Sequence, residues 1–133
     1  MEIIDFDVYG DDRGSLISLE QCKNIPFNIK RVYYIFNTSS GVSRGFHAHK
    51  NLKQIVIAIK GKCDFHIDEG QGIEVLTLDS PSRGLYIDKL SWREMHNFSN
   101  DCVLMVLASE IYDPSDYITS YEEFKGMANV RVR

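Results

Sequence analysis

The stretch that decides the fold is GVSRGFHAHKNLKQIVIAIKG, residues 41–61, which carries two of the chain's four histidines one residue apart. Residues i and i+2 of a β-strand point to the same face, so His47 and His49 should lie side by side. Two adjacent imidazoles can bind a transition metal through nitrogen. They can also act as an acid/base pair, because their ordinary pKa lies near neutrality. The apolar run at residues 53–61 predicts a strand that is buried on both faces.

The composition limits the kind of protein and its partners. The chain has 133 residues, of which 44% are hydrophobic and 26% charged, and this predicts a single domain spanning residues 1–133. A net charge of −4 gives no basic excess for nucleic acid. No apolar run is long enough to predict a membrane span. The acidic, strand-like start lacks the parts of a signal peptide, so we expect a cytoplasmic protein.

The three cysteines, Cys22, Cys63 and Cys102, are scattered and form no Cys-x-x-Cys pair. This spacing argues against a disulfide framework and against a zinc ribbon. We expect three small thiols that are buried or half-buried.

Short alternating or β-branched stretches dominate the remaining chain. We expect strands at residues 15–20, 30–37, 53–61, 62–68, 73–79, 84–90 and 102–112. Residues 116–128 predict the only helix, capped by Ser115, with Tyr117, Tyr121 and Phe124 on one face. The pattern predicts an all-β antiparallel sandwich or barrel, and specifically a jelly roll with a short C-terminal helix.

The spacing of residues 41–61 is similar to the first cupin motif, G-x5-H-x-H-x(3,4)-E-x6-G. His47 and His49 match its histidines, whereas Gln54 stands where the motif has glutamate. This resemblance covers the centre of the chain and implies the cupin jelly roll.

The second cupin motif, G-x5-P-x-G-x2-H-x3-N, has a weaker counterpart that begins at Gly84. Leu90 and Trp92 replace its proline and glycine, and Met95 stands where its metal-binding histidine would be. His96 comes one residue late and should face the other side of a regular strand. Since an uncharged amide is a poor transition-metal ligand, we expect no metal and no cofactor in the site. A metal-dependent small-molecule cupin is the alternative.

Four segments together resemble the nucleotide-sugar 3,4-ketoisomerases: RVYYIFN (31–37), SRGFHAHK (43–50), WREMHNFS (92–99) and SEIYDPSDYI (109–118). The resemblance implies conversion of dTDP-4-keto-6-deoxyglucose to a dTDP-3-keto-6-deoxyhexose in deoxysugar biosynthesis, without a metal. It also implies a homodimer with strand exchange between subunits. The segment DDRGSL (11–16) is similar to the 3,5-epimerases that act on the same substrate, and this is the alternative function. The epimerases lack a counterpart of His49, which favours the ketoisomerase.

The implied reaction requires two proton transfers, and the two histidines are the candidates to carry them out. The 4-keto group acidifies the proton on C3, a base removes it to give an enediolate, and a proton then passes between O3 and O4. We expect His47 to be the base at carbon and His49 to move the proton between the oxygens, although the spacing leaves the opposite assignment open. Tyr33 matches the family's active-site tyrosine and would steady an oxygen, with a packing role in the sheet as the alternative.

A pyrophosphate requires cationic partners, and arginine binds phosphate through two parallel hydrogen bonds. We expect Arg44 to bind the substrate phosphate, followed by Arg13 and Arg31. Gln54 would hydrogen-bond the sugar or the base, and Trp92 is equally compatible with a wall of the site and a core anchor.

Other polar side chains have no predicted part in the site. We expect surface charges at Arg83, Arg93, Arg131 and Arg133, an outward-facing His66, a structural His96 and a structural turn at Asp113-Pro114.

Overall fold

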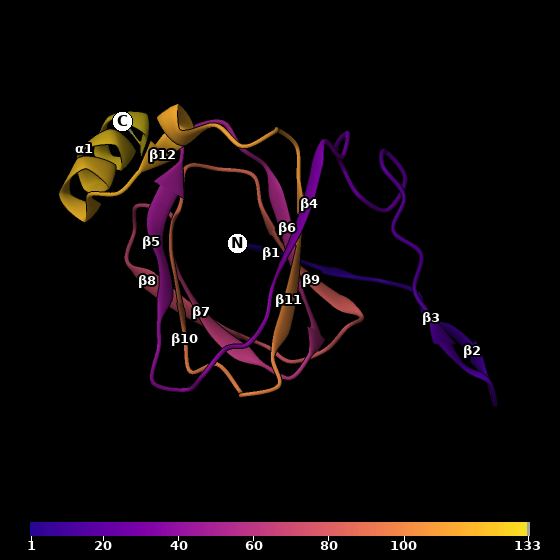
Figure 1. Cartoon of the computed structure of the whole chain (residues 1–133). Helices are drawn as coiled ribbons and strands as arrows, with labels where there is room; N and C mark the ends of the chain where they lie inside the picture. Colours follow the sequence, from indigo (N-terminus) through magenta and orange to yellow (C-terminus); the bar gives the residue numbers. More distant parts are fainter. Residues whose placement is uncertain (133) are drawn as a thin grey trace.

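Two five-stranded antiparallel sheets face each other in the computed structural model (Figure 1), which describes the backbone of residues 1–132 and side chains through residue 129. The first sheet is ordered β1 (Glu2–Asp5), β9 (Arg83–Ile87), β6 (Gln54–Lys60), β11 (Val103–Ala108), β4 (Arg31–Ile35). The second is ordered β12 (Tyr117–Ile118), β5 (Arg44–His49), β10 (Trp92–His96), β7 (Cys63–Asp68), β8 (Ile73–Leu78). A hairpin of β2 (Tyr9–Asp11) and β3 (Gly14–Leu16) projects away from the sandwich (Figure 1). The predicted all-β jelly roll is confirmed.

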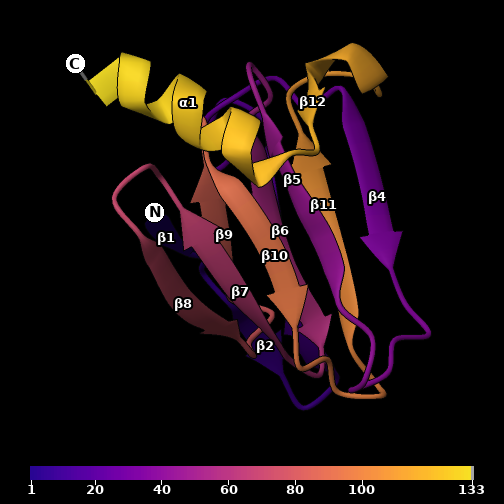
Figure 2. The same cartoon turned by 90° about the vertical axis from the view of Figure 1, so that its left-hand side faces the viewer.

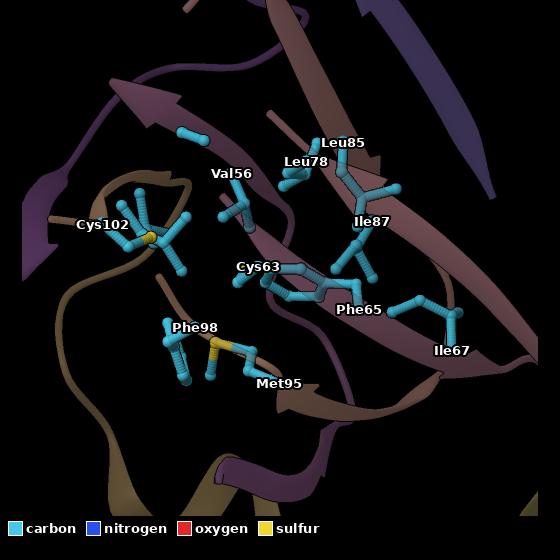
Figure 3. Packing of buried hydrophobic residues seen from close by; sticks show 13 residues of the cluster. Val56, Cys63, Phe65, Ile67, Leu78, Leu85, Ile87, Met95, Phe98 and Cys102 are labelled. Atoms are coloured by element: carbon cyan, nitrogen blue, oxygen red, sulfur yellow. The ribbon is translucent and has the colours of Figure 1, made fainter. Parts of the chain in front are cut away.

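The main core fills the space between the two sheets (Figure 3). On β7 the alternation predicted from the sequence places Cys63, Phe65 and Ile67 inward, where all three are buried. From the opposite sheet, Val56 and Leu104 join the same cluster. Full burial of an apolar side chain of this size contributes about 1.5–3 kcal/mol, so this layer holds the sheets together.

Strand β6 is buried on both faces, as its apolar run predicts. Its other face, with Ile55 and Ile57, is covered by Ile25 and Phe27 from the segment between β3 and β4. The strand expected at residues 15–20 is therefore wrong beyond Leu16, because the chain leaves the β2–β3 hairpin there to cover this sheet.

The C-terminal segment differs from the helix expected over residues 116–128. Pro114–Asp116 forms a 3-10 turn, Tyr117–Ile118 forms β12 against the end of β5, and α1 runs from Tyr121 to Val132. The predicted cap Ser115 is bound to Asp113 instead, and the Oγ of Ser120 accepts the backbone N–H of Glu123 at the start of α1. Pairing with β5 outweighs the local helical preference of this segment.

Helix α1 lies over the end of the second sheet, as Figure 2 shows. Phe124 and Ala128 of the helix pack on Ala48, Trp92 and Ile118. No helix in the described part of the chain combines the length and the apolarity needed to cross a membrane.

The cysteines are free thiols, but they are not all buried. Cys63 and Cys102 lie in the core, whereas Cys22 is exposed, which corrects the expectation for this residue. Cys22 adopts a positive φ of 58° in the segment that covers β6, and its Sγ contacts the side chain of Asn28 at 3.0 Å.

Gly61 is the point where the chain crosses from the first sheet to the second, so it forms a sharp bend rather than a hairpin. Its φ is +68°, and a Cβ there would lie 2.8 Å from the Cα of Cys102. We predict that Gly61→Ala lowers the free energy of unfolding by at least about 2 kcal/mol, from left-handed strain and overpacking together. Urea unfolding measures this loss.

The matched control is Gly126→Ala in α1, where a Cβ would meet no atom within 4 Å. Alanine is favoured over glycine in a helix, so this control should unfold at the same or a higher urea concentration. Equal stability of the two variants would contradict the role given to Gly61.

Candidate active site

The two histidines of β5 face the interior of the sandwich next to β12. The ring centroids of His47 and His49 are 4.9 Å apart, so the predicted shared face is confirmed. Tyr117, which pairs with His49 across the strands, has its ring centroid 4.3 Å from that of His49 and 5.1 Å from that of His47. The sequence prediction missed this tyrosine because it placed Tyr117 in a helix.

Arg93 lies opposite His47 on β10 and is only 3% exposed, so the expected surface charge is wrong. One guanidinium nitrogen donates to the side-chain oxygen of Gln54, and another donates to the carbonyl of Ser91 at 3.2 Å. The Nε of Arg93 is buried without a partner. Burial lowers the pKa of Arg93 to about 10, so the guanidinium remains protonated near neutral pH.

Regular alternation along β10 accounts for this orientation. Arg93 and Met95 point inward, whereas Glu94 and His96 form contacts on the outer face of the sheet. A β-bulge lies opposite them on β5, where Phe46 is the extra residue between the partners of Arg93 and Glu94 and adopts a positive φ of 57°. Bulges are common beside functional sites.

Gln54 connects Arg93 to Tyr33. Its side chain is 2% exposed, and its Nε2 donates to the hydroxyl of Tyr33 at 3.0 Å. Burial raises the pKa of Tyr33, which keeps the phenol protonated. The position that the cupin motif uses for a metal ligand is therefore engaged in holding a cation and a phenol.

His49 is oriented by Asp116, a residue that the sequence prediction did not select. The Nδ1 of His49 lies 3.2 Å from Oδ2 of Asp116, whose other oxygen accepts the backbone N–H groups of Lys50 at 3.2 Å and Asn51 at 3.0 Å. Burial, reinforced by the charge of Arg93, lowers the pKa of His49 to about 2. The imidazole is therefore neutral, and its contact with Asp116 is a hydrogen bond of an uncharged ring.

The hydrogen-bond partners of this ring determine which of its two nitrogens carries the proton. A carboxylate can only accept, so the single proton of neutral His49 sits on Nδ1 and is donated to Asp116. The Nε2 of His49 is buried and has no hydrogen-bond partner, so it presents a free lone pair. A basic nitrogen oriented by a carboxylate in this way is suited to general-base catalysis. Burial and the nearby Arg93 also lower the pKa of His47.

A cavity of about 250 Å³ opens onto His49, and its lining includes Arg31, Asp116 and Tyr117. The guanidinium of Arg31 lies over the ring of Tyr33, 5.0 Å from its centroid. The Nε of Arg31 is buried and has no partner. The structure thus brings this predicted arginine to the same cavity as His49.

The other predicted binding residues are not brought to this cavity. Arg44 lies at the opposite end of β5 from His49 and lines a small separate recess. Arg13 pairs with Asp11 on the projecting hairpin, and its side chain is 89% exposed. Trp92 is buried beneath α1 with its ring centroid 6.2 Å from that of Phe124, which is the core-anchor role.

The expected surface arginine Arg83 is exposed and pairs with Asp5. Arg133 lies outside the described residues, and so does the side chain of Arg131.

The fold and the inward-facing histidine pair define a cupin-type β-sandwich with two imidazoles side by side in its interior. The chain matches the family described as "FdtA: WxcM-like, C-terminal" over residues 1–129. It therefore belongs to this family. A curated relative from Aneurinibacillus thermoaerophilus, named TDP-4-oxo-6-deoxy-alpha-D-glucose-3,4-oxoisomerase, is 53% identical over 93% of this chain and 89% of its own.

The chain is also similar to solved structures that are named as 3,4-ketoisomerases. A 3,4-ketoisomerase from Helicobacter canadensis is 47% identical with a TM-score of 0.94, covering 96% of each chain. The sugar 3,4-ketoisomerase QdtA from Thermoanaerobacterium thermosaccharolyticum, solved in complex with TDP, is 41% identical with a TM-score of 0.96, covering 99% of this chain and 96% of its own.

The lowered pKa of His49 predicts a loss of stability in acid. An unfolded histidine titrates near 6.5, so His49 contributes its full stability above that pH and loses it as the pH falls. Below pH 6, His49 should reduce the free energy of unfolding by about 1.4 kcal/mol per pH unit. Urea unfolding of the wild type and of His49→Gln between pH 7 and pH 4.5 should show a shallower slope for the variant. Equal slopes would contradict a buried neutral His49.

Proposed function

We propose that this chain is a sugar-nucleotide 3,4-ketoisomerase that converts TDP-4-keto-6-deoxyglucose to a TDP-3-keto-6-deoxyhexose. The observation that carries the proposal is the bare Nε2 of His49, oriented by Asp116 and adjacent to His47. The reaction requires one base at carbon and one proton carrier between oxygens, and this pair supplies both. The names of the relatives agree with this reaction.

His49 is the base at carbon in this proposal, which reverses the assignment expected from the sequence. Its Nε2 takes the C3 proton, and the carboxylate of Asp116 stabilises the imidazolium that forms. Burial, reinforced by the charge of Arg93, holds the pKa of His49 low in the free protein. The negative pyrophosphate of the substrate acts in the opposite direction, so binding makes the imidazole more basic.

His47 is the proton carrier between the oxygens. Removal of the C3 proton leaves a negative charge on O4, and the neutral imidazole of His47 passes the proton of the O3 hydroxyl to O4. The imidazolium of His49 then returns its proton to C4, which leaves the ketone at C3 and consumes no other reactant. Tyr33 and Arg93 offer a phenol and a cation to the enediolate oxygens as charge develops on them.

The reaction uses no metal in this proposal. Gln54, at the ligand position of the motif, is occupied by Tyr33 and Arg93. A buried guanidinium next to the imidazoles also repels a second cation. Arg31 lines the cavity, and its buried Nε has no hydrogen-bond partner. It is therefore the arginine available in the cavity to bind a substrate anion.

A homodimer with exchanged hairpins would bring further residues to the site. In the described residues, the β2–β3 hairpin pairs with neither sheet, and it exposes the large apolar side chains Tyr9 and Leu16. Val32 and Tyr34 expose a second apolar surface on β4. A partner subunit would cover these surfaces, and Arg13 on the hairpin would then serve the partner's cavity. Arg44 would bind the nucleotide phosphate from the other end of β5.

Replacement of either histidine with asparagine should abolish turnover. We predict that His49→Asn and His47→Asn each lower kcat by at least about a hundredfold, since each loses one proton-transfer group. NMR of TDP-4-keto-6-deoxyglucose incubated in deuterated water provides the measurement. The wild type should place the ketone at C3 and leave C5 without deuterium, with deuterium at C4 only in so far as the proton on His49 exchanges with solvent before its return.

The exposed-face variant His66→Asn is the matched control and should retain turnover, and TDP should bind all three variants with near wild-type affinity. Normal turnover in both catalytic variants would contradict the acid/base assignment. Label at C5 with the ketone still at C4 would instead identify a 3,5-epimerase.

A further inference from the structure

A second group of titratable side chains lies on the outer face of the β12-β5-β10-β7-β8 sheet, outside the cavity. Glu94 and His96 are two residues apart on β10, and His66 on β7 is the direct cross-strand partner of Glu94. One ligand atom from each of these three residues lies within 4.8 Å of the others. The strand pairing therefore gathers two imidazoles and a carboxylate at one point, and all three side chains remain partly accessible.

The three side chains are held toward one another. The Nε2 of His96 is 2.8 Å from Oε1 of Glu94, and the ring centroids of His66 and His96 are 4.3 Å apart. Ser43 binds the other nitrogen of His96 at 2.7 Å, and the indole N–H of Trp92 donates to the second oxygen of Glu94 at 2.9 Å. Metal-binding histidines and carboxylates are oriented by outer partners of this kind.

We propose that His66, Glu94 and His96 form a Zn²⁺ site that is separate from the catalytic cavity. Two imidazole nitrogens and one carboxylate oxygen are a donor set of three-residue zinc sites, in which water takes the fourth position. The Glu94 side chain is held by Trp92 at one oxygen and by His96 at the other, and as a carboxylate it is the anionic ligand of the set. Its charge makes this face more favourable for a cation than the cavity, where Arg93 is positive.

The bound ion would tie β7 to β10 from outside the sandwich. His66 comes from β7, whereas Glu94 and His96 come from β10, so a shared ion adds a link between neighbouring strands. A ligand that binds only the folded chain raises its stability by mass action. Zn²⁺ should therefore raise the melting temperature without changing turnover.

Zinc titration of tag-free protein, stripped with a chelator and read through a competing chromophoric chelator, tests the site. We expect one Zn²⁺ per chain, and at least about tenfold weaker binding in His66→Gln and in His96→Gln. Ser43→Ala should weaken binding by roughly tenfold, because it loses only an outer partner. The His47→Asn/His49→Asn double variant should retain wild-type zinc affinity, and His66→Gln should retain full isomerase activity.

Histidine NMR of the wild type gives a second measurement that needs no variant. Zn²⁺ should shift the ring signals of His66 and His96 and leave those of His47 and His49 in place. Absence of stoichiometric binding by the wild type would overturn the proposal. It would also be overturned if the double variant lost the zinc while His66→Gln kept it, because the cation would then occupy the cavity.

Discussion

The electrostatics of the histidine pair depend on one guanidinium buried between the two sheets. Arg93 is held by the side chain of Gln54 and the carbonyl of Ser91, and in the described chain no carboxylate lies within ion-pair distance of it. Burial lowers the pKa of both imidazoles, and the charge of Arg93, acting in a low-dielectric interior, lowers it further, so both rings stay neutral. The same charge opposes metal binding and is available to an enediolate. The hydrogen bond from Arg93 to Gln54 therefore fixes the position of the charge that acts on the two histidines.

The C-terminal segment completes the site from the other side. Asp116 ends the 3-10 turn and Tyr117 begins β12, so pairing with β5 places a carboxylate and a phenol beside His49. Helix α1 then packs Phe124 over the outer face of the same sheet. Fold and site are coupled here, because Ile118 of β12, two residues after Asp116, packs against Phe124 of the helix that follows it.

Spacing along the chain was sufficient to predict the jelly roll and the shared face of His47 and His49, because alternation on a strand is a local rule. It also predicted the inward position of Gln54. The same alternation places Arg93 on the inward face of Met95, so the surface position expected for Arg93 contradicts the local rule itself. Tyr117 was assigned to a helix because local propensity takes no account of pairing with β5. The positions of Asp116 and Tyr117 could not be predicted because they are set by pairing between strands distant in sequence.

The central claim is that His49 is a neutral imidazole protonated on Nδ1, with Nε2 free to act as a base. Nitrogen-15 NMR of labelled protein measures the charge and the tautomer of each histidine directly. The account predicts that His49 stays in the neutral Nδ1–H form from pH 5 to pH 8, and that bound TDP-sugar moves its titration upward. An imidazolium at pH 7 in the free protein, or a proton on Nε2, would contradict it.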